Sequence, residues 1–206
     1  MTPTDLDHAL ASLAKRRPLF HSEADFQHEL AWELRERGFA RVVRLELPFD
    51  LSPKRRFNVD LVVGADDGPI AVELKCWPRK WAGVIGAERF NLKNRGAQDI
   101  GRYDYWKDLR RIEELKAANL IRWGAAIALT NDFAYWNLVR TGTMAEPFCL
   151  HEGRCIAGSA AWHRKSGTTV GRDEVIALKG TYDVRWRSYS HPPGCGELRY
   201  LSLIVE

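Results

Sequence analysis

Residues 59–77 read VDLVVGADDGPIAVELKCW, and two apolar runs on either side of a Gly-containing turn predict a β-hairpin. Asp60, Glu73 and Lys75 interrupt these otherwise apolar strands. Because side chains alternate between the two faces of a strand, the three charged residues fall on one face, close together. Like charges on neighbouring strands are destabilising, so placing Asp60 beside Glu73 costs stability and has no evident structural role. The hairpin therefore indicates a functional cluster, and the rival interpretation is an amphipathic hairpin whose charged face meets water.

The register of this hairpin depends on the position of the turn. A turn centred on residues 67–68 pairs Asp60 with Lys75, and a turn centred on residues 66–67 pairs Asp60 with Glu73. In both registers the opposite face is apolar and is expected to hold Val59, Leu61, Val63, Ile70, Val72 and Leu74.

A helix is predicted over residues 22–37, with Ser22 as its N-cap and Gly38 as its stop. At 100° per residue, one stripe of this helix should pack on the sheet. The residues of the stripe are Glu23, Gln27, Leu30 and Leu34. The acids expected to face solvent are Glu29, Glu33 and Glu36. Glu23 is therefore the acid that the helix brings toward the charged face of the hairpin.

The remaining pattern predicts an α/β chain. Strands are expected at 41–49, 57–63, 70–77 and 123–130, and a second long helix at 97–118. The order is thus helix, three strands, helix, strand over residues 1–131. Beyond this point apolar and polar residues alternate between Gly- and Pro-containing turns, so residues 132–206 are expected to form a strand-rich extension packed on the core.

Composition sets broad limits on the class of protein. The 206 residues are 45% hydrophobic and include eight Trp, enough for a packed core. A net charge of +4 is compatible with nucleic acid without demanding it. The four Cys form no CxxC pair, which disfavours a zinc knuckle or a disulfide framework. No apolar run reaches the roughly 18–20 residues of a membrane helix, and the N-terminus does not read as a signal peptide, so a cytoplasmic location is expected.

Two neighbouring carboxylates with a lysine beside them suit one kind of chemistry. Oxygen ligands favour Mg²⁺ or Mn²⁺, and a lysine at such a site can orient a water or stabilise charge on a phosphate. Asp60 followed by Glu73-Leu74-Lys75 resembles the PD-(D/E)xK motif of the restriction-endonuclease-like nuclease superfamily. Val59 stands where the motif has Pro, a replacement that the superfamily tolerates widely.

This resemblance implies a fold and a set of roles. The family core is helix, three strands, helix, strand, with a mixed central sheet flanked by helices, and the elements expected in residues 22–130 follow that order. By resemblance, Asp60 and Glu73 would bind Mg²⁺ or Mn²⁺, and Lys75 would assist the attacking water. Glu23 would match the acid that many members carry on the first helix.

Further positions resemble polar residues of the family. On the second helix these are Gln98, Tyr103, Asp104 and Asp108. Gln98 would approach the metal, and Tyr103 would support Lys75 or a phosphate. The rival interpretation is a solvated helix with Asp104/Lys107 and Asp108/Arg111 ion pairs. Glu46, on the first strand, matches an extra acid of some members.

The resemblance predicts a metal-dependent nuclease that hydrolyses phosphodiester bonds, with DNA as the expected substrate. The basic residues expected to hold the nucleic-acid backbone are Lys54, Arg55, Arg56, Arg79 and Lys80. Cutting both strands of a duplex would call for a homodimer. One alternative is a catalytically silent nucleic-acid-binding or assembly module on the same fold, and another is an interaction domain whose hairpin is a solvated surface.

Overall fold

A computed structural model describes residues 1–53, 55–65, 67–144 and 146–206. Lys54 of the expected basic group and Asp66 of the expected turn lie outside the described residues. The helices are α1 (Pro3–Arg16), α2 (Glu23–Glu36) and α3 (Gln98–Ala117), with short 3-10 turns η1 (Glu146–Phe148) and η2 (Gly167–Thr169). The strands are β1 (Val42–Ser52), β2 (Arg55–Gly64), β3 (Ile70–Trp77), β4 (Trp81–Ile85), β5 (Glu88–Leu92), β6 (Trp123–Thr130), β7 (Cys155–Ala160), β8 (Ile176–Asp183), β9 (Arg187–Ser190) and β10 (Leu198–Val205).

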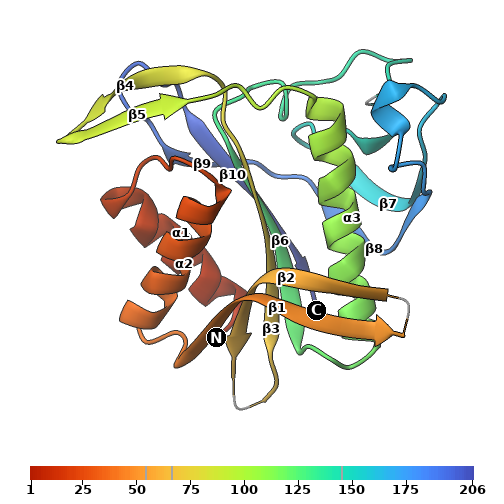
Figure 1. The fold of residues 1–206 in the computed structure, drawn as a ribbon, viewed down its shortest axis with the longest axis horizontal. Helices are drawn as coiled ribbons and strands as arrows, with labels where there is room; N and C mark the ends of the chain where they lie inside the picture. Colours follow the sequence, from red (N-terminus) through yellow and green to blue (C-terminus); the bar gives the residue numbers. More distant parts are fainter. Residues whose placement is uncertain (54, 66, 145) are drawn as a thin grey trace.

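A six-stranded mixed sheet in the order β1-β2-β3-β6-β10-β9 forms the centre of the molecule. β3 and β6 are parallel, as expected for strands joined through a helix, and the other neighbours are antiparallel. Figure 1 shows α1 and α2 on one face of the sheet, and α3 with the β7–β8 ladder on the other. The expected α/β class, with a mixed sheet between helices, is confirmed.

The register of the β2–β3 hairpin is the one centred on residues 66–67. Leu61 pairs with Val72, and the amide of Gly68 donates a hydrogen bond to the carbonyl of Ala65 at 3.1 Å across the turn. The alternative register, centred on residues 67–68, is wrong. Counted from the turn, the pairing of β2 with β3 ends at Leu61, which pairs with Val72. The charged residues Asp60 and Glu73 come directly after this last pair.

Two hydrophobic cores lie on the two sides of the sheet. The core against α1 and α2 contains the expected face of the hairpin, namely Leu61, Val63, Ile70, Val72 and Leu74. Val59 was expected with them, but it packs in the core against α3. On β1, Leu45 likewise packs on the α2 side and Leu47 on the α3 side, and between them Glu46 has a left-handed φ of 52°. Apolar side chains two residues apart, on either side of Glu46 in β1 and of Asp60 in β2, therefore lie on opposite faces of the sheet. The regular alternation of side chains between the two faces is interrupted at these two residues.

Helix α1 is absent from the elements expected from the sequence. It begins with a capping box, in which the Thr2 hydroxyl accepts from the Asp5 amide at 3.2 Å and the Asp5 carboxylate accepts from the Thr2 amide at 2.7 Å. Pro3 occupies the first helical position, where its missing N–H is no loss. The helix buries Leu6, Ala9, Leu10 and Leu13.

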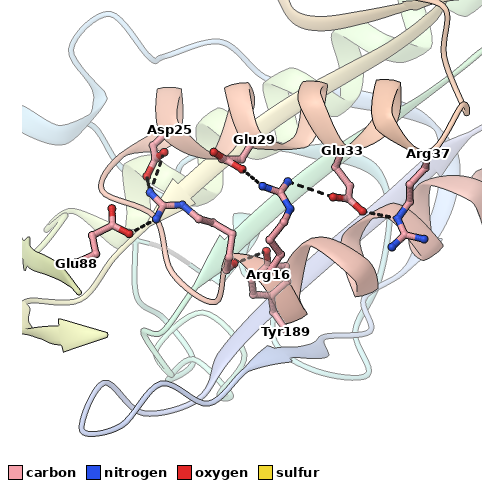
Figure 2. Close-up of polar contacts among 8 residues, drawn as sticks. Arg16, Asp25, Glu29, Glu33, Arg37, Glu88 and Tyr189 are labelled. Atoms are coloured by element: carbon pink, nitrogen blue, oxygen red, sulfur yellow. Dashed lines mark hydrogen bonds and ion pairs between the residues drawn. The ribbon is translucent and has the colours of Figure 1, made fainter. Parts of the chain in front are cut away.

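The α1–α2 contact corrects the expectation for Glu33. This carboxylate is 3% exposed rather than solvated, because Arg16 of α1 donates to it at 3.1 Å and Arg37 donates to it from the end of α2. Arg16 also donates to Glu29 at 2.8 Å, so one arginine joins two turns of α2 (Figure 2). The helix itself ends as predicted, with Gly38 in the left-handed region.

Residues beyond 131 contribute to the central sheet as well as packing on it. β10 pairs with β6 along its length, and β9 extends the sheet by one more strand. The β7–β8 ladder is tied to α3 by Glu113, which accepts hydrogen bonds from the amides of Lys179 and Gly180 and from the hydroxyl of Tyr182. The expected division into 1–131 and 132–206 stays a prediction, and the sheet contains strands from both ranges.

In the part of the chain that the structure describes, none of the helices has the length and apolarity needed to cross a bilayer. Cys76, Cys149 and Cys195 are buried free thiols, and Cys155 is an exposed one.

Candidate functional site

The candidate site lies where β2 and β3 separate. The amide of Leu74 donates to Oδ2 of Asp60 at 2.6 Å, and the amide of Asp60 lies 3.4 Å from Oε2 of Glu73. Each carboxylate thus contacts the main chain of the opposite strand in place of a ladder hydrogen bond. Beyond this point the β1–β2 hairpin turns toward α3. The two acids remain close to each other at the gap that opens between β2 and β3, which we call the opening.

Lys75 is held at the opening by α3. Its Nζ lies 2.6 Å from Oδ2 of Asp108 and donates to the carbonyl of Leu74 at 3.0 Å. Burial lowers the pKa of Lys75, but the carboxylates of Asp108, Glu23 and Asp60 outweigh burial, so the pKa lies above its usual value. Lys75 is therefore a charged ammonium at neutral pH, able to donate hydrogen bonds and unable to accept a proton.

Arg111 of α3 is a second cation at the acids. Its Nη1 lies 3.1 Å from Oδ1 of Asp108 and 3.8 Å from Oε1 of Glu73. The guanidinium also covers the ring of Phe57, with 5.1 Å between Cζ and the ring centroid. The expected Asp108/Arg111 pair is present, and it belongs to the acid cluster rather than to a solvated helix face.

Glu23 reaches the site from the first turn of α2. The helix starts there because the Ser22 hydroxyl accepts from the Asp25 amide at 3.1 Å. Oε2 of Glu23 accepts from the amide of Cys76 at 2.9 Å, next to Lys75 on β3. Burial raises the pKa of Glu23 and raises that of the Cys76 thiol to about 12, and Cys76 is a buried thiol.

Gln27 and Glu46 form a support that the sequence did not reveal. Gln27 is buried on α2, and its Nε2 donates to Oε1 of Glu46 at 3.1 Å and to the carbonyl of Asp60. The left-handed backbone of Glu46 costs roughly 1–2 kcal/mol, a strain that often marks functional sites. A polar side chain on the buried stripe of a helix was the available signal for Gln27.

The other α3 positions that resembled functional residues have their partners away from this cluster. Gln98 donates to Asp132 at 2.9 Å rather than to the acids of β2 and β3. The ring of Tyr103 is stacked on Trp162 at 5.4 Å, and Asp104 pairs with Arg172 at 3.5 Å rather than with Lys107.

The acids carry more negative charge than their cations balance. Four carboxylates (Glu23, Asp60, Glu73 and Asp108) lie around two cations (Lys75 and Arg111), and Arg95 is a third cation near Glu23. Glu73 is 2% exposed, and its burial, followed by the charges of Asp108 and Asp60, holds its pKa well above the usual value. Burial also raises the pKa of Asp60. Such a cluster is stabilised by any further cation.

The donors at this place are carboxylate oxygens. Oε1 of Glu73 is buried and has no hydrogen-bond partner, and carboxylate oxygens are the ligands that Mg²⁺ and Mn²⁺ prefer. Asp60 and Glu73 are the residues that could hold the ion. Over the described ranges, no group of three or more Asp, Glu, His or Cys side chains lies in metal-ligand geometry.

The expected basic residues that the structure describes come from two places in the fold. Arg55 and Arg56 begin β2, beside α3, whereas Arg79 and Lys80 lie between β3 and β4. In Figure 1 the β4–β5 hairpin is at the upper left, whereas the end of β1 and the start of β2 are at the lower right. The Arg79 guanidinium covers the ring of Phe133, with 5.0 Å between Cζ and the ring centroid.

No protein-family model, no curated protein and no solved structure matches this chain. The function is therefore inferred from the geometry of the site and the order of the elements that carry it.

Proposed function

We propose that this protein is a divalent-metal-dependent nuclease that hydrolyses phosphodiester bonds, with DNA as the expected substrate. The observation that carries the proposal is the group of Asp60, Glu73 and Lys75 at the separation of β2 and β3, backed by Asp108 of α3. A buried carboxylate oxygen without a partner supports it, because a cation would satisfy that oxygen.

The order of elements gives independent support for a restriction-endonuclease-like core. From α2 to β6 the chain runs helix, three strands, helix, strand, with the β4–β5 hairpin inserted before α3. The three strands are antiparallel neighbours, and the last strand returns parallel to the third. This agrees with the core that the PD-(D/E)xK resemblance implies.

The residues divide the work in this proposal. Asp60 and Glu73 would hold Mg²⁺ or Mn²⁺, which supplies Lewis-acid polarisation of the phosphate and lowers the pKa of a bound water. Lys75, kept charged by Asp108, donates hydrogen bonds to the attacking water or to the negative oxygens that develop on the phosphate. Glu23 fixes the main chain beside Lys75 through the Cys76 amide.

A second candidate is a nucleic-acid-binding module without chemistry, and one observation favours it. The carboxylates of Asp60, Glu73 and Glu23 each contact a backbone amide, so each already has a structural partner. In that case the acids close the gap between β2 and β3 and need no metal.

A cleavage assay separates the two candidates. The parent protein, Asp60→Asn, Glu73→Gln and Lys75→Ala are incubated with labelled single-stranded DNA, duplex DNA and RNA, in Mg²⁺, in Mn²⁺ and in EDTA. The nuclease requires cleavage by the parent in at least one metal, none in EDTA, and a loss of about 10²-fold or more in each variant, as for the removal of one charge-stabilising group.

Glu36→Gln is the matched control, because Glu36 is an exposed acid at the far end of α2 from Glu23 and lies outside the site. It should cleave like the parent. Circular dichroism verifies that each variant is folded. If folded Asp60→Asn and Lys75→Ala cleave as fast as the parent, the proposed roles of these residues are wrong. Binding without cleavage in either metal favours the second candidate.

A further inference from the structure

A basic pocket of about 580 Å³ lies between the start of β2 and the middle of α3. We call it the α3 pocket; the cations that line it are Arg55, Arg56, Lys107, Arg110 and Arg111. Glu174 is the acid in its lining. A pocket of this size, with this excess of positive charge, suits an anionic group.

The α3 pocket is directly connected to the candidate active site through Arg111. The same guanidinium that lines the pocket lies 3.1 Å from Oδ1 of Asp108 and 3.8 Å from Oε1 of Glu73. An anion in the pocket is therefore one side chain away from the acids that would hold the metal. A polyanionic strand can occupy both places at once.

The cations of the pocket differ in how far they are engaged. Arg55 lies 2.5 Å from Glu114, and Arg111 is held by Asp108. Lys107 is half-buried on α3, and within the described ranges no acid forms an ion pair with it. Lys107 is thus the cation of the pocket that a bound anion would satisfy most directly.

Glu174 takes the position of such an anion at Arg110. Its carboxylate lies 2.7 Å from Nη2 of Arg110, while its side chain is 60% exposed and comes from the segment before β8. The hydrogen bond from Arg110 lowers the pKa of Glu174, so the carboxylate is charged. An exposed side chain can leave this contact without disturbing the core.

We propose that the α3 pocket is a phosphate subsite for a nucleic-acid strand, adjacent to the reacting phosphate. Lys107 and Arg110 bind a backbone phosphate there, and Glu174 is displaced from Arg110 when the strand enters. This inference rests on the proposed nuclease function and names how that function holds its substrate. The ligand chemistry is the phosphodiester backbone, which DNA and RNA share.

Salt dependence of binding provides the test, because each phosphate contact releases counterions and a merely structural side chain does not. Fluorescence anisotropy is measured in EDTA with labelled single-stranded DNA, duplex DNA and RNA of equal length. One contact contributes about 0.7–0.9 to the slope of log K against log salt, or about threefold in affinity between roughly 50 and 200 mM salt.

Two variants should move in opposite directions. Lys107→Ala should weaken binding and reduce the slope by about 1. Glu174→Gln should tighten binding and steepen the slope, since it removes the shorter ion pair of Arg110 and leaves the 3.9 Å pair with Glu114. Lys93→Ala and Glu36→Gln are the matched controls, because both residues are exposed and lie outside the pocket. The three nucleic acids show which backbone the pocket favours.

The outcomes separate the pocket from the nuclease. If the parent cleaves and the slope of log K against log salt is the same for Lys107→Ala as for Lys93→Ala, the proposal that the pocket binds phosphate is wrong, and the proposed nuclease function is retained. If the parent binds without cleaving in Mg²⁺ or Mn²⁺, the nuclease falls, and the two slopes decide whether the pocket binds phosphate. A parent that binds none of the three nucleic acids overturns both proposals.

Discussion

Replacing Glu73 by glutamine should stabilise the metal-free protein. The Glu73 carboxylate is buried, its Oε1 has no hydrogen-bond partner, and Asp60 and Asp108 repel its charge. A glutamine of nearly the same shape removes the charge. The glutamine oxygen can keep the contact with the Asp60 amide that Oε2 makes, and its amide nitrogen then takes the place of the unpartnered Oε1 and can donate to a neighbouring carboxylate. The site would then satisfy its polar atoms without a metal.

The expected size of the effect follows from the unpartnered oxygen. A buried acceptor without a partner costs about 1–3 kcal/mol, and a charged acceptor costs more. In a chain of this length, 1 kcal/mol moves the melting temperature by about 2–4 °C. Glu73→Gln should therefore raise the free energy of unfolding by about 1–3 kcal/mol and the melting temperature by roughly 2–12 °C.

The gain should depend on pH in a definite direction. Because the pKa of Glu73 is raised in the folded state, its protonated form stabilises the fold below the unfolded pKa of about 4.3, and this stabilisation is lost as the pH rises. The advantage of the glutamine should therefore be largest at neutral pH and shrink as the pH approaches about 4.3, where both side chains are neutral.

Thermal unfolding followed by circular dichroism, in EDTA and at several pH values, measures this effect. Glu36→Gln is the control, since Glu36 is an exposed acid of α2 and should leave the melting temperature unchanged. The reasoning is refuted if Glu73→Gln melts at or below the parent temperature at neutral pH. A gain of equal size at every pH would show that the charge of Glu73 is not its cause.

Three further results are expected. Glu33→Ala should cost about 1–3 kcal/mol in urea unfolding, because Arg16 and Arg37 lose the buried carboxylate they share, and an unchanged midpoint would contradict the α1–α2 contact. Gly124→Ala should cost about 1–3 kcal/mol, since its Cβ would meet Ile112 and lie 2.9 Å from a β3 carbonyl; a melting temperature equal to the parent's would argue against this packing. Mn²⁺ should stabilise the parent by about 2.7 kcal/mol at a hundredfold excess over its dissociation constant, and so raise its melting temperature. A calorimetric titration that shows no heat of Mn²⁺ binding would count against the metal site.

Local signals in the sequence were sufficient for the elements that surround the site. The Ser22 N-cap, the Gly38 stop and the alternating apolar residues of the hairpin predicted α2, β2 and β3 close to their observed bounds. The clustering of Asp60 with Glu73 followed from the same alternation. These features depend on residues that are near one another in the chain, so local sequence patterns were enough to predict them.

The features that pattern missed depend on contacts distant in sequence. Glu33 is buried only because α1 packs over it, and the capping box that starts α1 at Thr2 was present but not used. The turning of β1 at Glu46 places Val59 on the α3 side, and a regular alternation cannot express such a turn. Lys75 contacts Asp108 because α3 packs on the sheet. The spacing of the two residues in the sequence does not predict that contact.

The position of β10 between β6 and β9 has a consequence for how the chain is made on the ribosome. β6 is buried along its whole length and has β10 as its second neighbour, yet β10 lies far downstream of it in the chain. At about 5–20 residues per second, the roughly 70 residues between them take on the order of 4–14 s to translate. During that interval the apolar strand WGAAIALT has an open edge, so nascent chains stalled before residue 198 should be the species that aggregates or recruits chaperones.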